Sequence, residues 1–492
     1  MSSVFRPKFY INVPMLLRVV GWLLMILAAF MLFPTIAGLL TGDKGVMGFV
    51  WSLLITLGAG FGMMSIRPKS REMGKREAIL LVSLTWEILA LFGMLPFLFC
   101  DTHTNVTDAF FETMSGFTTT GMSALNTLHG VPDSIILWRC VTQWIGGMGI
   151  ILFTLAVLPM LNYQGGMQMF NAEVTGITHD KLRPRVSNTA KSLWLIYIIL
   201  TGCLTVLLLF SGMKFFDAVC YGLSIMSTGG FAVADQSVLD LGSIYVKIVV
   251  TVFMFLGGVN FSLMYAAVTG HPRRALRNEP LKWYVWWILI GYALFCLNVL
   301  LRNIGHSVGD FTLDPLFQAV SVISSTGITE PDFHNWGSLS EMVLIMMMMT
   351  GACAGSTSGG AKIDRFIVLF KFLRNEFYKM MHPSAVTTVC INGKGTSYLV
   401  VQKVLAFLFV YIFVIIGCGI LLVIMGLPLK TAFFYGLSAI SNAGIGTEIN
   451  GISWQFSALP AAGKWLLTFV MLVGRLELFT VMLLFVPSFW RK

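Results

Sequence analysis

Four stretches of the chain share one pattern, and this pattern decides the fold. They read DAFFETMSGFTTTGM (108–122), DAVCYGLSIMSTGGF (217–231), DPLFQAVSVISSTGI (314–328) and TAFFYGLSAISNAGI (431–445). Each has Asp or Thr first, Ser after six intervening residues, Ser or Thr three positions later, and Gly six positions after the first Ser. The four glycines are separated by 109, 97 and 117 residues, and the alignment needs no gap. Such self-similarity predicts a repeat architecture with four units.

The composition around the repeats is that of an integral membrane protein. Hydrophobic residues make up 56% of the 492 residues and charged residues only 11%, whereas a soluble domain is about 25% charged. These values exclude a disordered chain, a nucleic-acid-binding domain and a cytosolic enzyme as leading interpretations, and no nucleic acid is expected as a partner. The net charge of +10 is concentrated in a few short loops, which is typical of cytoplasmic loops.

Ten segments are apolar enough to cross a membrane, since a spanning helix needs about 20 mostly apolar residues. They are 13–40, 46–66, 78–100, 137–161, 190–211, 245–269, 284–304, 341–373, 397–425 and 464–487. Basic loops follow every second segment, and the opposite loops are mainly acidic. We therefore expect both termini on the cytoplasmic side. The prediction is an all-α multi-pass membrane protein with ten transmembrane helices and four short re-entrant pore helices.

The repeat divides the chain into five units. Two extra N-terminal helices occupy 1–76, and the four repeats occupy 77–170, 171–275, 276–395 and 396–492. Each repeat is expected to run from a spanning helix through a short helix and a polar, glycine-containing segment to a second spanning helix.

The shared pattern has a physical interpretation. Its first residue, Asp or Thr, is expected to cap a helix of about ten residues, which is roughly 15 Å long and half the hydrocarbon thickness. The C-terminal ends of four such helices carry partial negative charge and would stabilise a cation on a common axis. Glycine permits backbone angles that a side chain forbids, and rings of backbone carbonyls replace the hydration shell of ions in cation channels. Four unrelated loops with turn glycines are the alternative.

At these residues the chain resembles the Trk/Ktr/HKT superfamily of potassium transporters. In that family one chain holds four potassium-channel-like units, each with a degenerate selectivity filter that keeps its glycine. The two extra helices, residues 169–185 and residues 351–362 look most similar to the bacterial Trk-H-type membrane subunit. The resemblance implies that K⁺ is the transported ion and that it contacts Thr119, Thr120, Gly121, Thr228, Gly229, Gly230, Ser325, Thr326, Gly327, Asn442, Ala443 and Gly444.

Two filter positions need comment. In plant relatives a serine at the first filter glycine goes with sodium preference, so Gly121 implies a preference for potassium. The doubled Gly229-Gly230 leaves the register of the second filter open by one residue, and the upstream Asp and Ser favour Gly230.

The eighth predicted span is interrupted by GACAGSTSGGAK at 351–362. Its glycines and hydroxyl residues would break a helix at membrane depth, and the corresponding segments of the other repeats lack such a run. Similar family members use this intramembrane loop as a gate below the filter. Small residues for tight helix packing are the alternative. The expected gate residues are Gly351, Gly355, Ser356, Thr357, Ser358, Gly359, Gly360, Lys362 and Arg475.

Arg475 is the most specific single-residue prediction. An arginine within a span is costly and often functional, and on the pore axis it would repel cations. An ion pair with Glu477 is the alternative, although residues two apart do not share a helix face. Lys362 is expected either to line the same vestibule or to be structural. Glu87 and Asn260 are expected to make structural hydrogen bonds.

The sequence therefore favours a potassium-selective uptake pathway and not an enzyme. The alternatives are a sodium- or ammonium-permeable pore, or a cation/proton-coupled symporter of the same fold. A membrane enzyme or receptor would need a polar catalytic cluster, which the sequence does not display. The resemblance also implies a homodimer, surrounded by membrane lipid in the bacterial cytoplasmic (inner) membrane, with a cytosolic nucleotide-binding regulatory ring (Trk-A-like) as partner.

Overall fold

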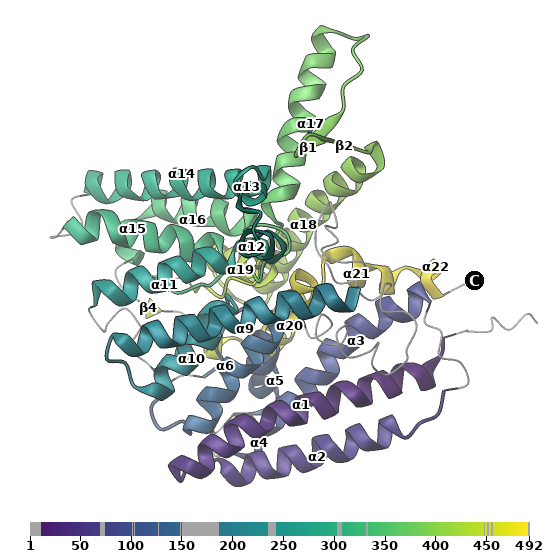
Figure 1. Ribbon diagram of the computed structural model, residues 1–492, viewed down its shortest axis with the longest axis vertical. Helices are drawn as coiled ribbons and strands as arrows, with labels where there is room; N and C mark the ends of the chain where they lie inside the picture. The colour runs from purple at the N-terminus through teal and green to yellow at the C-terminus, as the bar shows by residue number, and fades with distance from the viewer. Residues whose placement is uncertain are drawn as a thin grey trace, which may run out of the picture.

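The two helices before the repeats, α1 (Val13–Thr41) and α2 (Val46–Met64), pack as an antiparallel pair along one side of the molecule (Figure 1). Glycines allow the pair to approach closely, because a β-carbon on Gly21 would lie 2.8 Å from the carbonyl oxygen of Gly60. The structure is a computed structural model that describes residues 11–68, 74–100, 102, 104–125, 127–147, 149, 186–234, 243–302, 308–330, 333–446, 448–449, 452–453 and 456–490.

Each repeat supplies an outer helix, a short helix and an inner helix. The outer helices are α3 (Lys75–Gly93) with its extension α4 (Leu95–Phe99), α9 (Val186–Phe210), α14 (Glu279–Arg302) and α18 (Tyr398–Ile424). The short helices are α5 (Val106–Phe117), α10 (Phe215–Met226), α15 (Val308–Ile323) and α19 (Leu429–Ile440). The inner helices are α6 (Asp133–Gly147), α11 (Ile244–Gly257) with α12 (Phe261–Val268), α16 (Ser338–Thr350) with α17 (Ile363–Met381), and α20 (Ala461–Arg475) with α21 (Leu478–Met482).

The remaining elements are short connections. Two antiparallel hairpins pair β1 (Val389–Ile391) with β2 (Lys394–Thr396), and β3 (Glu448–Ile449) with β4 (Ile452–Ser453). The first hairpin follows α17, whose far end projects from the body of the molecule (Figure 1). The other short helices are α13 (Pro272–Leu276), η3 (Phe333–Trp336), η4 (Phe456–Ala458), η5 (Leu483–Phe485) and α22 (Pro487–Trp490).

Six described helices are long and apolar enough to cross a membrane, and two bent pairs raise the number to eight. The six are Val13–Thr41, Val46–Met64, Arg76–Phe99, Lys191–Phe210, Glu279–Arg302 and Tyr398–Ile424. The predicted span 137–161 begins in α6, and most of its second half lies outside the described residues. The predicted span 341–373 is divided between α16 and α17. The chain is therefore a multi-pass helical membrane protein, while the total of ten spans stays a prediction.

The inner helices of the second and fourth repeats are bent, although their predicted spans 245–269 and 464–487 carry no run like that at 351–362. Helices α11 and α12 meet at 104°, and α20 and the α21 segment meet at 117°. The first break follows Gly257 and Gly258, and Asn260 caps the new helix by accepting from Ser262 N at 2.7 Å. At the second break Glu477 has a φ of 59°. The inner helices of the second, third and fourth repeats are therefore all broken.

The short helices also begin earlier than the sequence predicted. The predicted caps Asp108, Asp217 and Thr431 lie at the third helical position of α5, α10 and α19, and Asp314 lies inside α15. In α5 the cap is Asn105, three residues upstream, which accepts from the Asp108 backbone N at 2.8 Å. The acidic side chains still favour the positive N-terminal end of the helix.

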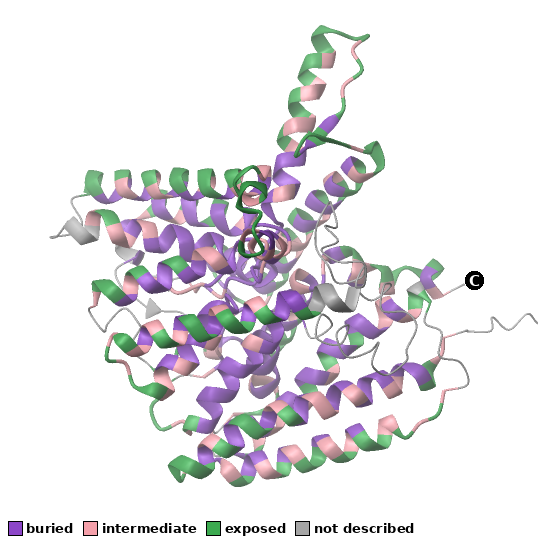
Figure 2. Cartoon of the chain, viewed as in Figure 1, coloured by how far each residue is buried: buried purple, intermediate pink, exposed green. Residues whose placement is uncertain are grey.

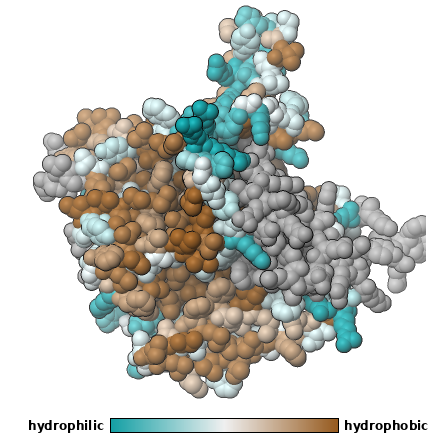
Figure 3. Space-filling view, in the orientation of Figure 1, coloured by the Kyte–Doolittle hydropathy of each residue, from teal (hydrophilic) through white to brown (hydrophobic). Residues whose placement is uncertain are grey.

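The buried core runs through the middle of the molecule, where the short and inner helices meet (Figure 2). The outer helices leave large apolar side chains exposed, among them Trp286 on α14 and Phe409 on α18. Figure 3 shows continuous apolar surface over the helical body and hydrophilic atoms near α13 and the far end of α17. An apolar exterior of this kind matches a lipid environment.

Candidate functional site

Glycines from all four repeats form a closed ring. All four have positive φ angles, between 65° and 82°, in a region that glycine enters readily and other residues rarely enter. A β-carbon on each would collide with the carbonyl oxygen just before the glycine of the next repeat. A β-carbon added to Gly121 would lie 2.2 Å from the carbonyl oxygen of Gly229, and one added to Gly230 would lie 1.8 Å from that of Thr326. The corresponding distances are 1.9 Å from a β-carbon on Gly327 to the oxygen of Ala443, and 2.0 Å from a β-carbon on Gly444 to the oxygen of Thr120. The last contact returns to the first repeat and closes the ring.

The backbone sets the register of the second repeat. Gly230 has the positive φ of the ring glycines, whereas Gly229 is equivalent to Thr120, Thr326 and Ala443. The position two residues before each ring glycine is also left-handed in every repeat, with φ angles of 53°, 55°, 55° and 51° at Thr119, Thr228, Ser325 and Asn442. All twelve predicted filter residues therefore lie together at the centre of the molecule.

The first serine of each repeat, which the sequence analysis aligned but did not assign a role, anchors the segment that follows the short helix. Its carbonyl oxygen accepts a backbone N–H five residues later at 2.8 to 3.0 Å, from Thr120, Gly229, Thr326 and Ala443. In three repeats its hydroxyl also donates to the carbonyl one residue beyond the glycine. These bonds run from Ser224 to Phe231 at 3.1 Å, Ser321 to Ile328 at 2.6 Å and Ser438 to Ile445 at 3.0 Å.

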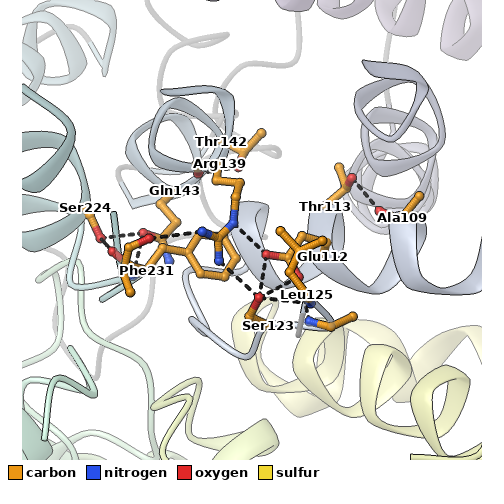
Figure 4. Close-up of polar contacts among 12 residues, drawn as sticks. Ala109, Glu112, Thr113, Ser123, Leu125, Arg139, Thr142, Gln143, Ser224 and Phe231 are labelled. Atoms are coloured by element: carbon orange, nitrogen blue, oxygen red, sulfur yellow. Dashed lines mark hydrogen bonds and ion pairs between the residues drawn. The ribbon is translucent and has the colours of Figure 1, made fainter. Parts of the chain in front are cut away.

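The first repeat uses a buried ion pair instead (Figure 4). Glu112 on α5 and Arg139 on α6 lie 2.7 Å apart, and both are buried. Glu112 accepts from the backbone N of Ala124 at 2.7 Å, and Arg139 donates to the carbonyl of Ala232 in the second repeat at 3.0 Å. The Arg139 guanidinium also lies 4.2 Å from the centroid of the Phe231 ring. This network joins the residues that follow the ring glycines of the first and second repeats.

A glutamine extends this network into the second repeat. Figure 4 shows Gln143 between Arg139 and Ser224. Its side-chain oxygen accepts from the Ser224 hydroxyl at 2.8 Å and from the Phe231 backbone N at 3.2 Å. Glu112, Arg139 and Gln143 share no local spacing, so the sequence alone does not indicate that they lie together.

The interrupted segment 351–362 packs against the residues that precede the ring. Thr357 lies 3.3 Å from the hydroxyl of Thr228, and Ser358 lies 3.0 Å from that of Ser325. The backbone N of Gly359 donates to the Ser325 hydroxyl at 2.7 Å. A β-carbon on Gly359 would lie 2.2 Å from the carbonyl of Ser441 in the fourth repeat. The segment therefore contacts residues that precede the ring glycine in three of the four repeats.

The interrupted segment also packs against the bend between α11 and α12 in the second repeat. Gly257 and Gly258 accept backbone hydrogen bonds from Thr357 and Cys353 at 3.2 Å each. Asn260 donates to the carbonyl of Ala354 at 2.6 Å, which confirms its predicted structural role. Among the remaining segment residues, Gly351, Gly355 and Gly360 have positive φ angles, and the Ser356 hydroxyl donates to Cys353 O within the segment.

Arg475 joins the segment to the first repeat. It donates to the carbonyl of Thr357 at 2.8 Å and to the carbonyls of Gly146 and Gly147 at 2.5 and 2.8 Å. The alternative partner Glu477 pairs with Arg365 instead. Arg475 thus connects the fourth repeat, the interrupted segment and the first inner helix.

Lys362 is buried at the start of α17, with a φ of 70°, and donates to the carbonyl of Ser358. Lys362, the last residue of the interrupted segment, therefore bonds back to an earlier residue of the same segment. Gly146 and Gly147 provide the carbonyl acceptors for Arg475. Gly146 also packs closely, since a β-carbon on it would lie 1.8 Å from Phe117 O.

The fold and site define a class: a multi-pass helical membrane protein in which four repeats share one central glycine ring. The family model for TrkH, described as a cation transport protein, matches residues 47–492. The chain belongs to this family, which confirms the predicted superfamily and the expectation of an ion transporter and not an enzyme.

Named relatives match nearly the whole chain. The Trk system potassium uptake protein TrkH of Vibrio parahaemolyticus is 34% identical over 484 residues, covering 97% of this chain and 99% of the relative. The protein of the same name from Salmonella typhimurium is 33% identical over 481 residues, covering 96% and 99%. The crystal structure of the potassium transporter TrkH from Vibrio parahaemolyticus has a TM-score of 0.88 at 32% identity and covers 98% of this chain and 100% of that chain.

Proposed function

We propose that this chain is the ion-conducting subunit of a bacterial Trk potassium uptake system. The closed ring of four glycines is the observation that carries the proposal. The names of the relatives, which describe potassium uptake proteins, support the choice of ion.

In this proposal the twelve filter residues bind K⁺ through their backbone carbonyls. Rings of carbonyls replace the hydration shell of the ion, and the C-terminal ends of the four short helices add favourable partial charge. Each ring glycine contacts the carbonyl of the next repeat, so a side chain at one position would displace a carbonyl that belongs to another. Selectivity would therefore depend on all four repeats together.

We further propose that segment 351–362 is the gate. Its hydrogen bonds to Thr228 and Ser325 occupy hydroxyls at the gate side of the filter. Opening would break these bonds together with the bond from Arg475 to Thr357 O. Arg475 and Lys362 place positive charge beside the path, which would disfavour cations while the segment is in position.

The proposal also covers the membrane location, the oligomeric state and the cytosolic partner of the chain. We place the chain in the bacterial inner membrane as a homodimer with both termini in the cytosol, where a nucleotide-binding ring of the Trk-A type would control the gate. The basic loops around 67–76, 181–191 and 371–394 would suit an acidic docking surface, although parts of the first two lie outside the described residues.

The test is ion flux into proteoliposomes that contain the purified chain, measured with K⁺ and with Na⁺. A second preparation lacks residues 355–360, so that a closed gate cannot hide the pathway. K⁺ flux well above Na⁺ flux supports the proposal. Equal K⁺ and Na⁺ flux would favour a non-selective or sodium-permeable transporter, and no flux from either folded preparation would contradict conduction.

A further inference from the structure

A groove of about 370 Å³ lies on the surface between α14 and α17, away from the glycine ring. Its lining is entirely apolar and consists of Trp283, Trp286, Trp287, Ile290 and Phe370. Trp283 and Phe370 stack with ring centroids 5.8 Å apart and an interplanar angle of 16°. Trp286 is 64% exposed. Tryptophans of this kind are enriched where a membrane protein crosses the membrane–water interface.

The groove is fixed at the basic end of α14. Lys371 on α17 pairs with Glu279, the first residue of α14, and donates to the carbonyl of Cys390 at 2.7 Å. The same end of α14 adjoins α13, which carries Arg273 and Arg274. Figure 3 shows this change from apolar surface to hydrophilic surface around α13. The two helices that form the groove are therefore held together beside a basic boundary.

Two cations continue the groove toward that boundary. Lys282 lies four residues before Trp286 on α14, and Arg374 lies four residues after Phe370 on α17. Residues four apart share a helix face, so each cation lies one turn beyond a groove residue. Both are exposed, and neither makes an ion pair with any residue that the structure describes. Exposed arginine and lysine beside an apolar strip match a phosphate next to an acyl chain.

We propose that this groove binds an anionic phospholipid, with an acyl chain against the tryptophans and the phosphate held by Lys282 and Arg374. A second copy of the chain is a poorer occupant, because a symmetric contact places the same surface on both sides and would bring these cations toward their counterparts. The site is separate from the ion pathway, so its test does not depend on conduction.

The experiment measures lipid binding to the full chain by native mass spectrometry in mild detergent, with phosphatidylglycerol and phosphatidylcholine as competing probes. We expect phosphatidylglycerol to be retained preferentially. The double variant Lys282→Gln/Arg374→Gln should lose about thirtyfold in affinity, since each cation near an anionic headgroup contributes about fivefold. Lys403→Gln, which removes an exposed cation near the start of α18, should behave as the wild type.

Each other outcome has a defined meaning. An unchanged phosphatidylglycerol preference in the double variant would overturn the proposal, and so would an equal loss in Lys403→Gln, which would indicate diffuse surface charge. Loss of dimer on Trp286→Ala without loss of bound lipid would show that a second copy occupies the groove. The single variants Lys282→Gln and Arg374→Gln, each expected to lose about fivefold, provide the test if the double variant does not fold.

Discussion

Single residues at the glycine ring are held by contacts that leave little room for change. Glu112 and Arg139 show this most clearly, because their side chains are 0% and 2% exposed and lie 2.7 Å apart. Removing one member of a buried ion pair leaves an uncompensated charge and costs about 3–5 kcal/mol. The pair therefore makes the first repeat sensitive to either substitution alone.

We expect Arg139→Met to lower the thermal unfolding temperature of the purified protein strongly, because it leaves the Glu112 carboxylate buried without its cation. Adding Glu112→Gln removes that charge and should recover most of the loss. Equal destabilisation of the single and double variants would show that the pair contributes through packing and not through charge.

In the proposed pathway, Arg475 would act on passing cations through its charge. At a separation of about 10 Å and an effective dielectric constant of about 20, a unit charge costs a passing cation about 1.7 kcal/mol, or about 17-fold in rate. Arg475→Ala should therefore raise K⁺ flux in proteoliposomes by about that factor, while Arg475→Lys should remain close to the wild type. Unchanged flux in Arg475→Ala would move this residue away from the pathway.

Among the elements, segment 351–362 is held in position partly by side-chain hydroxyls. Thr357 and Ser358 contact Thr228 and Ser325 beside the glycine ring, whereas Ser356 donates to Cys353 O within the segment. A neutral hydrogen bond contributes about 1 kcal/mol, so losing two of them changes a two-state population by roughly thirtyfold.

Thr357→Val with Ser358→Ala should therefore increase K⁺ flux in the absence of any partner protein. Ser356→Ala is the matched control, because it removes a hydroxyl from the same segment without removing a contact to the filter. The same K⁺ flux in the wild type, the double variant and Ser356→Ala would mean that these bonds do not hold the proposed gate closed.

The sequence predicted these elements unevenly. The four short helices and the glycine register followed from the repeat pattern, because identical spacing imposes an identical backbone. Their starts were misplaced in α5, α10 and α19, because the aspartates and Thr431 prefer the first turn as well as the cap position. The bend at Glu477 places a residue other than glycine in the left-handed region, which the sequence does not indicate. The Glu112–Arg139 pair joins residues 27 positions apart, which no local pattern reveals.

The whole molecule is organised as a cycle of repeats. Ion pairs follow the same order as the glycine contacts: Lys247 to Asp314 at 2.6 Å joins the second repeat to the third, and Lys464 to Asp108 at 2.5 Å joins the fourth to the first. Asn442 also donates to the hydroxyl of Thr120 at 3.0 Å. The N-terminal and C-terminal repeats are therefore direct neighbours at the site.

Closure of the cycle should be energetically significant. The Lys464 side chain is only 6% exposed, so Lys464→Met should destabilise the protein by about 3 kcal/mol or more. Lys430→Met is the control, because the Lys430–Glu341 pair is a contact to the preceding repeat whose lysine side chain is 58% exposed, and exposed pairs contribute about 0–1 kcal/mol. Equal unfolding temperatures for the two variants would contradict this account of closure.

The most direct test of the central claim is the K⁺/Na⁺ permeability ratio after Gly→Ser substitution at each of the four ring positions in turn, measured in proteoliposomes with residues 355–360 removed. Each substitution should lower the ratio by about tenfold or more, since the new side chain displaces a carbonyl of the adjacent repeat. Gly202→Ser on α9, where a β-carbon meets nothing within 4 Å, should leave the ratio unchanged. A folded variant at any of the four positions that keeps the wild-type ratio would contradict a filter built jointly by all four repeats.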